Sequence, residues 1–288
     1  MDAKNVSIVF TSNGKEMVFG KRSAYKIRSV QGLETSDITL TATENSGIDG
    51  ATVTNRRLGP RHIDIIGGIP SGDREAYRET LVRFFNPSNE GTAIIEYCGR
   101  KRKVEYLIEN VDFGTLDSVY KIPEFTVSLY CENPMLLSTS SYGRNIAAFI
   151  PQFALPFKCT VEKKQIMGYQ KISQSILITN DGDKAVGAEF VITATRGDVS
   201  NPTIQNETTG QYIKVVRTLS MGDILRISTI PRQKEILING SNAIADMDRM
   251  SDLSLSIMPG DNVLEYDAEN GMTNMDVRLY YTPEYLGV

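Results

Sequence analysis

The single histidine is the first candidate for acid–base chemistry in this sequence. His62 is the one histidine, and it lies in Arg61-His62-Ile63-Asp64-Ile65, where apolar and polar residues alternate as in a strand. A hydrolase triad would need a nucleophile motif, and a zinc site would need further ligands at short spacing. The sequence offers neither beside His62, so we expect a structural histidine and predict no catalytic residue.

Paired carboxylates are the second possible chemistry, since two acidic side chains can hydrolyse a glycosidic bond. The chain has 35 aspartate and glutamate residues, so chance alone brings acidic pairs together. Catalysis requires two environments that push the pKa values of such a pair apart. Nothing in the sequence marks such a pair, and we predict that the protein is not an enzyme.

Two short motifs could hold a ligand but lack the rest of its site. Gly67-Gly68-Ile69-Pro70-Ser71-Gly72 lies between an expected strand and an expected helix, yet it lacks the lysine of a phosphate-binding loop. Asn180-Asp181-Gly182-Asp183 lacks the spaced oxygen ligands and the distant glutamate of a calcium loop. We interpret both as turns and predict no cofactor and no metal.

The three cysteines, Cys98, Cys131 and Cys159, are odd in number and widely separated. This arrangement fits neither a disulfide framework nor a paired metal-ligand pattern. We therefore expect three ordinary buried thiols.

Charge and hydropathy limit the partners. The net charge is only -4, and Arg100-Lys101-Arg102-Lys103 is the one basic run. We interpret it as a solvated hairpin tip, so we predict no nucleic-acid binding. No apolar stretch has the length of a signal peptide or a membrane span. We expect no membrane partner and synthesis in a host cytoplasm without secretion.

The elements expected around these residues are mostly strands, because short β-branched runs alternate with period two between turn residues. One helix is expected from Ser71 to Asn86, with Ser71 or Asp73 as its cap and Pro87 ending it. The segment 45–60 is interpreted as an exposed glycine-bearing loop. The strands expected before residue 137 lie at 5–10, 16–19, 25–31, 37–43, 62–66, 92–98, 103–109 and 125–131.

A second domain is expected after a serine-rich linker at 138–143. Its run of short strands without a helix predicts two sheets packed face to face. The fold class is thus all-β with one helix, and the domains are expected at 1–137 and 138–288. The expected strands lie near 174–179, 187–195, 211–217, 223–229, 234–238, 243–247, 253–257, 263–267 and 276–282.

The order of several motifs resembles the distal tail protein family of siphophages. In the first half these are Arg61-His62-Ile63-Asp64-Ile65-Ile66-Gly67-Gly68, Asp73-Arg74 opening the helix, and Phe85-Asn86-Pro87. Ser128-Leu129-Tyr130-Cys131-Glu132-Asn133-Pro134 then looks like the end of the family's ring-forming domain. Later segments fall in the order of its C-terminal galectin-like sandwich: Ile178-Thr179-Asn180-Asp181-Gly182-Asp183, Gly222-Asp223-Ile224-Leu225-Arg226-Ile227, Ile238-Asn239-Gly240-Ser241-Asn242 and Met258-Pro259-Gly260-Asp261-Asn262.

The resemblance implies a fold and a set of partners. The first domain would be a ring-forming β-sandwich or split barrel, and the second a galectin-like jelly roll. It also implies a hexameric ring at the virion tail tip, between the tail tube protein and a tail-associated lysin, fibre or receptor-binding protein. Two departures are Asn133 before the proline, where the family often has an acidic residue, and the absence of tryptophan.

A ring needs contacts between copies, and the glycine-bearing loop is our candidate for one. A solvated loop without such a role is the alternative. A carbohydrate-binding module of a tail or cell-surface protein is the competing function, although the lack of tryptophan weakens sugar stacking. The candidate interface residues are Gly47, Asp49, Gly50, Arg56, Arg57 and Arg61.

Overall fold

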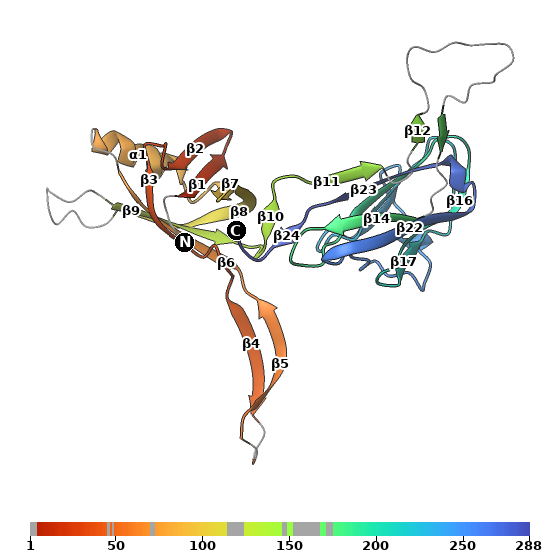
Figure 1. The fold of residues 1–288 in the computed structure, drawn as a ribbon, viewed down its shortest axis with the longest axis horizontal. Coiled ribbons are helices and arrows are strands. Elements are labelled where there is room, and N and C mark those ends of the chain that lie inside the picture. The colour runs from red at the N-terminus through yellow and green to blue at the C-terminus, as the bar shows by residue number, and fades with distance from the viewer. Residues whose placement is uncertain are drawn as a thin grey trace, which may run out of the picture. The chain divides into compact units, whose positions relative to one another are not determined.

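The computed structural model describes residues 5–44, 47, 49–69, 73–113, 124–145, 149–151, 168–170 and 175–288. The chain divides into two compact units (Figure 1). Unit 1 is Met1–Thr139 together with Glu284–Val288, and unit 2 is Ser140–Pro283. Apart from one α-helix and short 3-10 turns, the regular structure of the described residues is β, which confirms the expected fold class.

A single sheet forms the body of unit 1, with its strands in the order β2-β1-β7-β8-β9-β6-β3. A parallel bridge joins Phe19 on β2 to Tyr25, the residue before β3, so the two ends of this sheet meet. A sheet that curls back on itself in this way protects its edge strands. The strands are β1 (Val6–Ser12), β2 (Lys15–Gly20), β3 (Lys26–Gln31), β6 (Arg61–Gly68), β7 (Glu90–Tyr97), β8 (Arg100–Asp112) and β9 (Glu124–Cys131).

The core of unit 1 lies inside this curved sheet, where strands such as β1 and β9 bury alternate residues. β1 shows strict alternation, and β9 does so after its first residue. Aromatic rings fill the centre edge to face: the ring centroids of Phe10 and Phe19 are 4.9 Å apart, those of Phe10 and Phe85 5.2 Å, and those of Phe19 and Phe125 5.3 Å. Such pairs add about 0.5–1.5 kcal/mol each beyond area burial.

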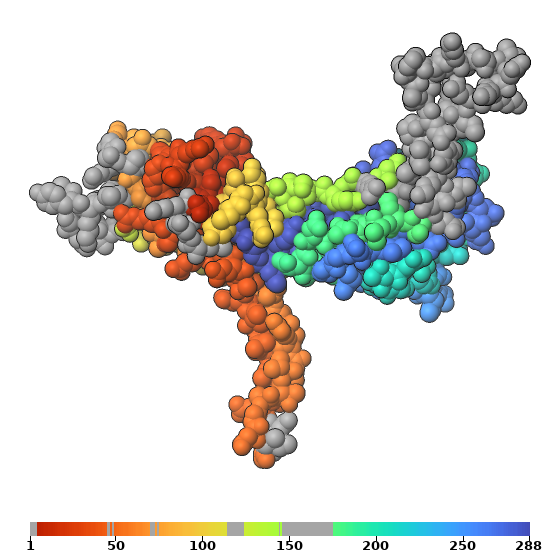
Figure 2. Space-filling view, in the orientation of Figure 1, coloured from red at the N-terminus to blue at the C-terminus, as the bar shows by residue number. Residues whose placement is uncertain are grey.

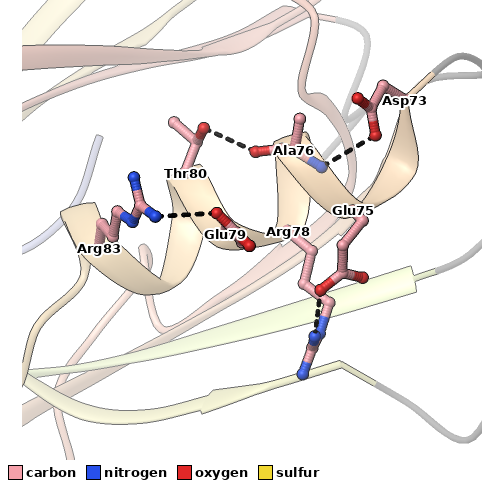
Figure 3. Close-up of polar contacts among 7 residues, drawn as sticks. All are labelled: Asp73, Glu75, Ala76, Arg78, Glu79, Thr80 and Arg83. Carbon is pink, nitrogen blue, oxygen red and sulfur yellow. Dashed lines mark hydrogen bonds and ion pairs between the residues drawn. The ribbon is translucent and has the colours of Figure 1, made fainter.

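Helix α1 (Arg74–Phe84) covers this core, and its ends follow the sequence signals. The Asp73 carboxylate accepts a hydrogen bond from the Ala76 amide at 3.2 Å, which caps the first turn (Figure 3). Leu81 and Phe85 are buried against the sheet. Ser71, the other expected cap, lies outside the described residues.

The outer face of α1 carries ion pairs one turn apart. Arg78 contacts Glu75 at 2.8 Å and Arg83 contacts Glu79 at 2.9 Å (Figure 3). All four side chains are largely exposed, so these pairs contribute little to stability. None of the helices in the described part of the chain combines the length and apolar character needed to cross a membrane.

A long two-stranded hairpin leaves unit 1 between β3 and β6. Its strands are β4 (Ile38–Glu44) and β5 (Ala51–Leu58), and they pair with each other alone among the described strands. The expectation of a loop across 45–60 is therefore wrong for 51–58, which is a regular strand. Figure 2 shows the hairpin as an orange arm that stands clear of the rest of its unit.

Unit 2 is a sandwich of two antiparallel sheets around one apolar core. One sheet has the order β11-β23-β15-β19-β20-β21, and the other has the order β14-β22-β16-β17 with β18 beside β16. β12 (Phe149–Pro151) and β13 (Gly168–Gln170) form a separate pair. The sandwich strands are β11 (Tyr142–Asn145), β14 (Ser175–Asn180), β15 (Glu189–Ala194), β16 (Val199–Asn206), β17 (Gln211–Lys214), β18 (Thr218–Leu219), β19 (Ile224–Ser228), β20 (Glu235–Ile238), β21 (Ser241–Asn242), β22 (Gly260–Asn270) and β23 (Met275–Tyr281).

The strands of unit 2 differ from the expectation in several places, beginning with β11, which starts inside the linker expected at 138–143. β16 is central to its sheet but was not expected, because Asn201, Pro202 and Asn206 resemble turn residues. The segment expected as a strand at 243–247 contains the 3-10 turn η2 (Ile244–Asp246). The segment 253–257 is not a strand, since Asp252 accepts a hydrogen bond from the Ser254 amide and turns the chain.

Candidate assembly surface

The tip of the β4–β5 hairpin contains three of the six candidate residues. Gly47, Asp49 and Gly50 are all exposed there. Gly47 has a φ of 88° and Gly50 a φ of 104°, conformations that residues with a side chain rarely adopt. The glycines therefore shape the turn that joins the two strands.

The pairing register gives the hairpin two chemically different faces, because directly opposite residues of antiparallel strands share a face. Apolar pairs such as Ile38 with Leu58 and Ala42 with Val53 lie on one face. Pairs such as Thr43 with Thr52 lie on the other. We call these the apolar face (Ile38, Leu40, Ala42, Ala51, Val53 and Leu58, with Glu44 and Arg56) and the threonine face (Thr39, Thr41, Thr43, Thr52, Asn55 and Arg57).

A β-bulge keeps the apolar face continuous. The register shifts between Thr41 and Ala42, which leaves Thr54 as the extra residue of β5, and the Thr54 hydroxyl donates to the Thr41 carbonyl at 3.0 Å. If the same sequence continued in register without a bulge, Val53 would pair with Thr43 and point to the threonine face. The bulge thus places Val53 beside Ala42.

The apolar face is open to solvent within the single chain. The exposed fractions are 45% for Ile38, 56% for Leu40 and 54% for Val53. An isolated two-stranded ribbon is only marginally stable in water, and exposed apolar strands invite pairing or packing with another chain. The hairpin has the properties of a surface that is covered on assembly.

The two adjacent arginines of the hairpin are separated by this geometry. Arg56 is opposite Leu40 on the apolar face, and Arg57 is opposite Thr39 on the threonine face. Both side chains are exposed. These two residues are adjacent in the sequence but lie on opposite faces of the hairpin.

Arg61 requires a correction, because it is not part of an exposed loop. It begins β6 and is only 1% exposed. Its guanidinium donates to three carbonyl oxygens of unit 1: that of Pro134 at 2.8 Å, that of Gly32 at 2.6 Å and that of Leu286 at 2.7 Å. Burial lowers the pKa of Arg61, and no contact with a second copy is available to its side chain in this fold.

His62 lies on the surface of the unit 1 sheet. Its Nδ1 is 2.8 Å from Glu109 Oε2, and its ring meets that of Tyr130 edge to face at 5.4 Å. The imidazole side chain is 44% exposed. A pair this open to water contributes little energy, so its main effect is to orient the ring.

The other residues with possible chemistry are dispersed. Within the described ranges no three His, Cys, Asp or Glu side chains come together as a metal site. Asn180-Asp181-Gly182-Asp183 forms a turn in which Asn180 Oδ1 accepts from the Gly182 amide at 2.9 Å. Gly67, Gly68 and Ile69 are buried, and the rest of that glycine-rich segment, 70–72, is outside the described residues.

The cysteines differ from one another. Cys131 is buried, as expected, and burial raises the pKa of its thiol to about 11. The expectation of a buried thiol is wrong for Cys98, which is exposed in the turn after β7 with a φ of 50°. Cys159 lies outside the described residues.

The basic run is also placed differently from the prediction. The turn between β7 and β8 is formed by Cys98 and Gly99, so Arg100 already belongs to β8. The Arg102 guanidinium stacks over the ring of Tyr285, with 3.4 Å from its central carbon to the ring centroid. Arg102 therefore packs within unit 1 instead of lying at a solvated tip.

Solved structures share this fold at low sequence identity. The SPP1 Dit protein, described as a paradigm of the hub adsorption apparatus of phages that infect Gram-positive hosts, matches with a TM-score of 0.66 and 14% identity over 97% of this chain and 99% of that one. A chain of the phage P2 baseplate, in its activated conformation with Ca, matches with a TM-score of 0.50 and 10% identity over 96% and 98%. No curated protein sequence matches.

Two family models match the sequence itself. The phage tail protein RIFT-related domain matches residues 12–131, which include strands β2, β3 and β6 to β9 of the curved sheet, α1 and the hairpin. The siphovirus-type tail component, C-terminal domain, matches residues 181–285, which include most of the sandwich. Together the two models account for most of the chain and agree with the fold match to the SPP1 Dit protein. The chain belongs to the distal tail protein family of siphophages.

Proposed function

We propose that the protein is a structural component of a phage tail, which forms a hexameric ring at the tail tip and has no catalytic role. The family membership supports this proposal, since the matching models are of tail components. In the particle, the ring would join the tail tube protein to the adsorption apparatus, namely a tail-associated lysin, fibre or receptor-binding protein.

The observation that carries the proposal is the uncovered apolar face of the β4–β5 hairpin. Monomeric proteins rarely expose a contiguous apolar patch, and here three large aliphatic side chains are exposed on one face of a projecting hairpin. A ring of identical subunits requires a heterologous contact, in which a surface of one copy meets a different surface of the next. A projecting hairpin supplies such a surface, and burying its apolar side would contribute roughly 1 kcal/mol for each half-exposed aliphatic residue.

The candidate interface residues take separate roles in this proposal. Gly47, Asp49 and Gly50 would contact the neighbouring copy at the tip. Arg56 would border the apolar contact with its charged group at the rim, where an arginine can pair with an acidic partner. Arg57 would remain on the threonine face. Reversing the charge of Arg56 should therefore weaken assembly more than reversing that of Arg57.

The test compares substitutions on the two faces of one hairpin. Leu40→Glu and Val53→Glu place a charge on the apolar face, and Thr41→Glu and Thr52→Glu are matched controls on the threonine face. Assembly is measured on the purified full chain by sedimentation velocity across a range of concentrations. We expect the apolar-face variants to lose the assembled species and the controls to retain it.

Far-UV circular dichroism first establishes that all four variants are folded. The interface is overturned if the apolar-face variants and the threonine-face variants then assemble to the same extent. The hexamer itself is tested separately by the wild-type mass. A strictly monomeric wild-type protein would contradict the ring, whichever face of the hairpin proved sensitive.

A further inference from the structure

The last five residues, Glu284–Val288, belong to unit 1 although unit 2 precedes them in the sequence. Strand β24 (Glu284–Tyr285) pairs antiparallel with β10 (Leu136–Ser138), so that Tyr285 is opposite Leu136. β10 in turn pairs with β8. The end of the chain is thus an added strand on the sheet of unit 1.

A buried arginine holds the backbone of this segment. Arg61 Nη2 donates to the carbonyl oxygen of Leu286 at 2.7 Å. The same guanidinium donates to the carbonyls of Gly32 and Pro134, which fixes it between two loops of unit 1. Hydrogen bonds from a charged donor are stronger than those between neutral groups.

Close contacts restrict the residue type at two positions of the segment, Tyr285 and Gly287. The ring of Tyr285 lies under the Arg102 guanidinium, an arrangement in which the cation is attracted to the aromatic face. A Cβ atom at Gly287 would lie 2.7 Å from the carbonyl oxygen of Glu34, so this position accepts only glycine without a shift of backbone. Leu286, between them, is 38% exposed.

We propose that Arg61, Arg102, β10 and the backbone at Leu33–Glu34 form a peptide-binding groove whose ligand is the chain's own C-terminal segment. The groove takes a short extended peptide with an aromatic residue followed two positions later by glycine. The peptide adds a strand to the sheet, and side-chain contacts at alternate positions give specificity. The segment is therefore a separable ligand and also binds when it is no longer covalently attached.

The experiment uses the full chain with a protease recognition sequence inserted between Pro283 and Glu284. The folded protein is cut and passed over a sizing column, and a fluorescent peptide of residues 282–288 is then added in excess. We expect the cut segment to co-elute with the protein and the labelled peptide to displace it with saturable anisotropy. In the labelled peptide, Gly287→Val and Tyr285→Ala should each weaken binding about tenfold or more, which corresponds to at least about 1.4 kcal/mol.

Leu286→Ala is the matched control, because it removes an exposed side chain and keeps the carbonyl that Arg61 binds. Its affinity should stay within about twofold of the wild-type peptide, since surface substitutions usually change free energies by less than 0.5 kcal/mol. Immediate loss of the segment with no saturable rebinding would overturn the proposal, and so would unchanged affinity of the Gly287→Val peptide. If cutting unfolds unit 1, excess peptide must restore its circular dichroism, and failure to do so also overturns the proposal.

Discussion

Replacing Arg61 with methionine is expected to destabilise unit 1 by about 3–5 kcal/mol, because three hydrogen bonds from a charged donor, each worth about 1.5–3 kcal/mol, are lost while the desolvation cost of the buried cation is recovered. Methionine has a similar length and no donor, so the carbonyls of Gly32, Pro134 and Leu286 would each lose their bond to this guanidinium. An unsatisfied buried acceptor costs about 1–3 kcal/mol. Part of this loss is offset, because the variant no longer buries a cation. None of the three groups that bind this cation is a carboxylate, so its burial carries a desolvation cost.

This loss is a large fraction of the free energy of unfolding of an ordinary domain, which is about 5–15 kcal/mol. Urea unfolding followed by far-UV circular dichroism measures it, since the chain has no tryptophan to report on the transition. The two units require a fit with two transitions. Hydrogen exchange with mass spectrometry assigns the weakened transition, and the segments around Gly32, Pro134 and Leu286 should lose protection together.

Two further variants complete this test. Arg61→Lys keeps the charge but places all three donors on one nitrogen, whereas the three carbonyls are bound by three different nitrogens of the guanidinium. The lysine variant should therefore behave more like methionine than like wild type. Arg100→Met is the control, because Arg100 is exposed. A loss below about 1 kcal/mol for Arg61→Met, within the range of an ordinary substitution, would refute the reasoning.

Three other predictions concern unit 1. Gly32 and Gly99 both have a φ of 82°, but only at Gly32 would a Cβ collide with the backbone carbonyl of His62. Gly99→Ala should therefore lower the free energy of unfolding by about 1–2 kcal/mol through conformational strain, and Gly32→Ala should lower it by more, as measured by urea unfolding. The Cys131 thiol has its pKa raised from 9.0 to about 11, so the folded state holds a proton that the unfolded chain releases. This stabilisation is complete below pH 9 and is lost as the pH rises to about 11, with a total of about 3 kcal/mol, and Cys131→Ala should flatten the decline of stability measured over that range. The Tyr106 hydroxyl is buried and has no hydrogen-bond partner among the residues that the structure describes. Tyr106→Phe should therefore leave the free energy of unfolding unchanged or raise it by up to about 1 kcal/mol, and a decrease of more than about 1 kcal/mol would contradict this prediction.

Local signals were sufficient to predict much of the fold. The alternation of β1 and β9 marks half-buried strands directly. Asp73 and Pro87 bracket α1, because a side-chain cap and a proline act within a few residues of where they stand. Hairpins such as β1 with β2 and β7 with β8 join strands that are close in the sequence, but β1 also pairs with β7 and β14 pairs with β22 across long stretches of chain. Periodicity therefore predicts a β-rich class and not the order of the strands.

Two features could not be predicted, for opposite reasons. β5 was missed because its bulge at Thr54 interrupts the period of two between Val53 and Arg56. The role of Arg61 was missed because its acceptors are 29, 73 and 225 residues away along the chain. A charged residue near a glycine-rich segment suggests exposure, and only the folded chain brings these distant carbonyls to the guanidinium.

The candidate interface stays a prediction, and the structure shows only where its residues lie. Gly47, Asp49 and Gly50 mark a turn by their types, and the structure has them exposed at the tip of the hairpin. The division of Arg56 and Arg57 between two faces depends on the register of β4 with β5. A loop has no such register, so the sequence interpretation treated the two arginines as equivalent.

The most direct test of the account is the native mass of the purified full chain, measured by light scattering after size exclusion and followed by negative-stain class averages. The account predicts a species of six times the monomer mass and rings of sixfold symmetry, both lost in Leu40→Glu. A protein that remains monomeric at the highest attainable concentration would contradict it.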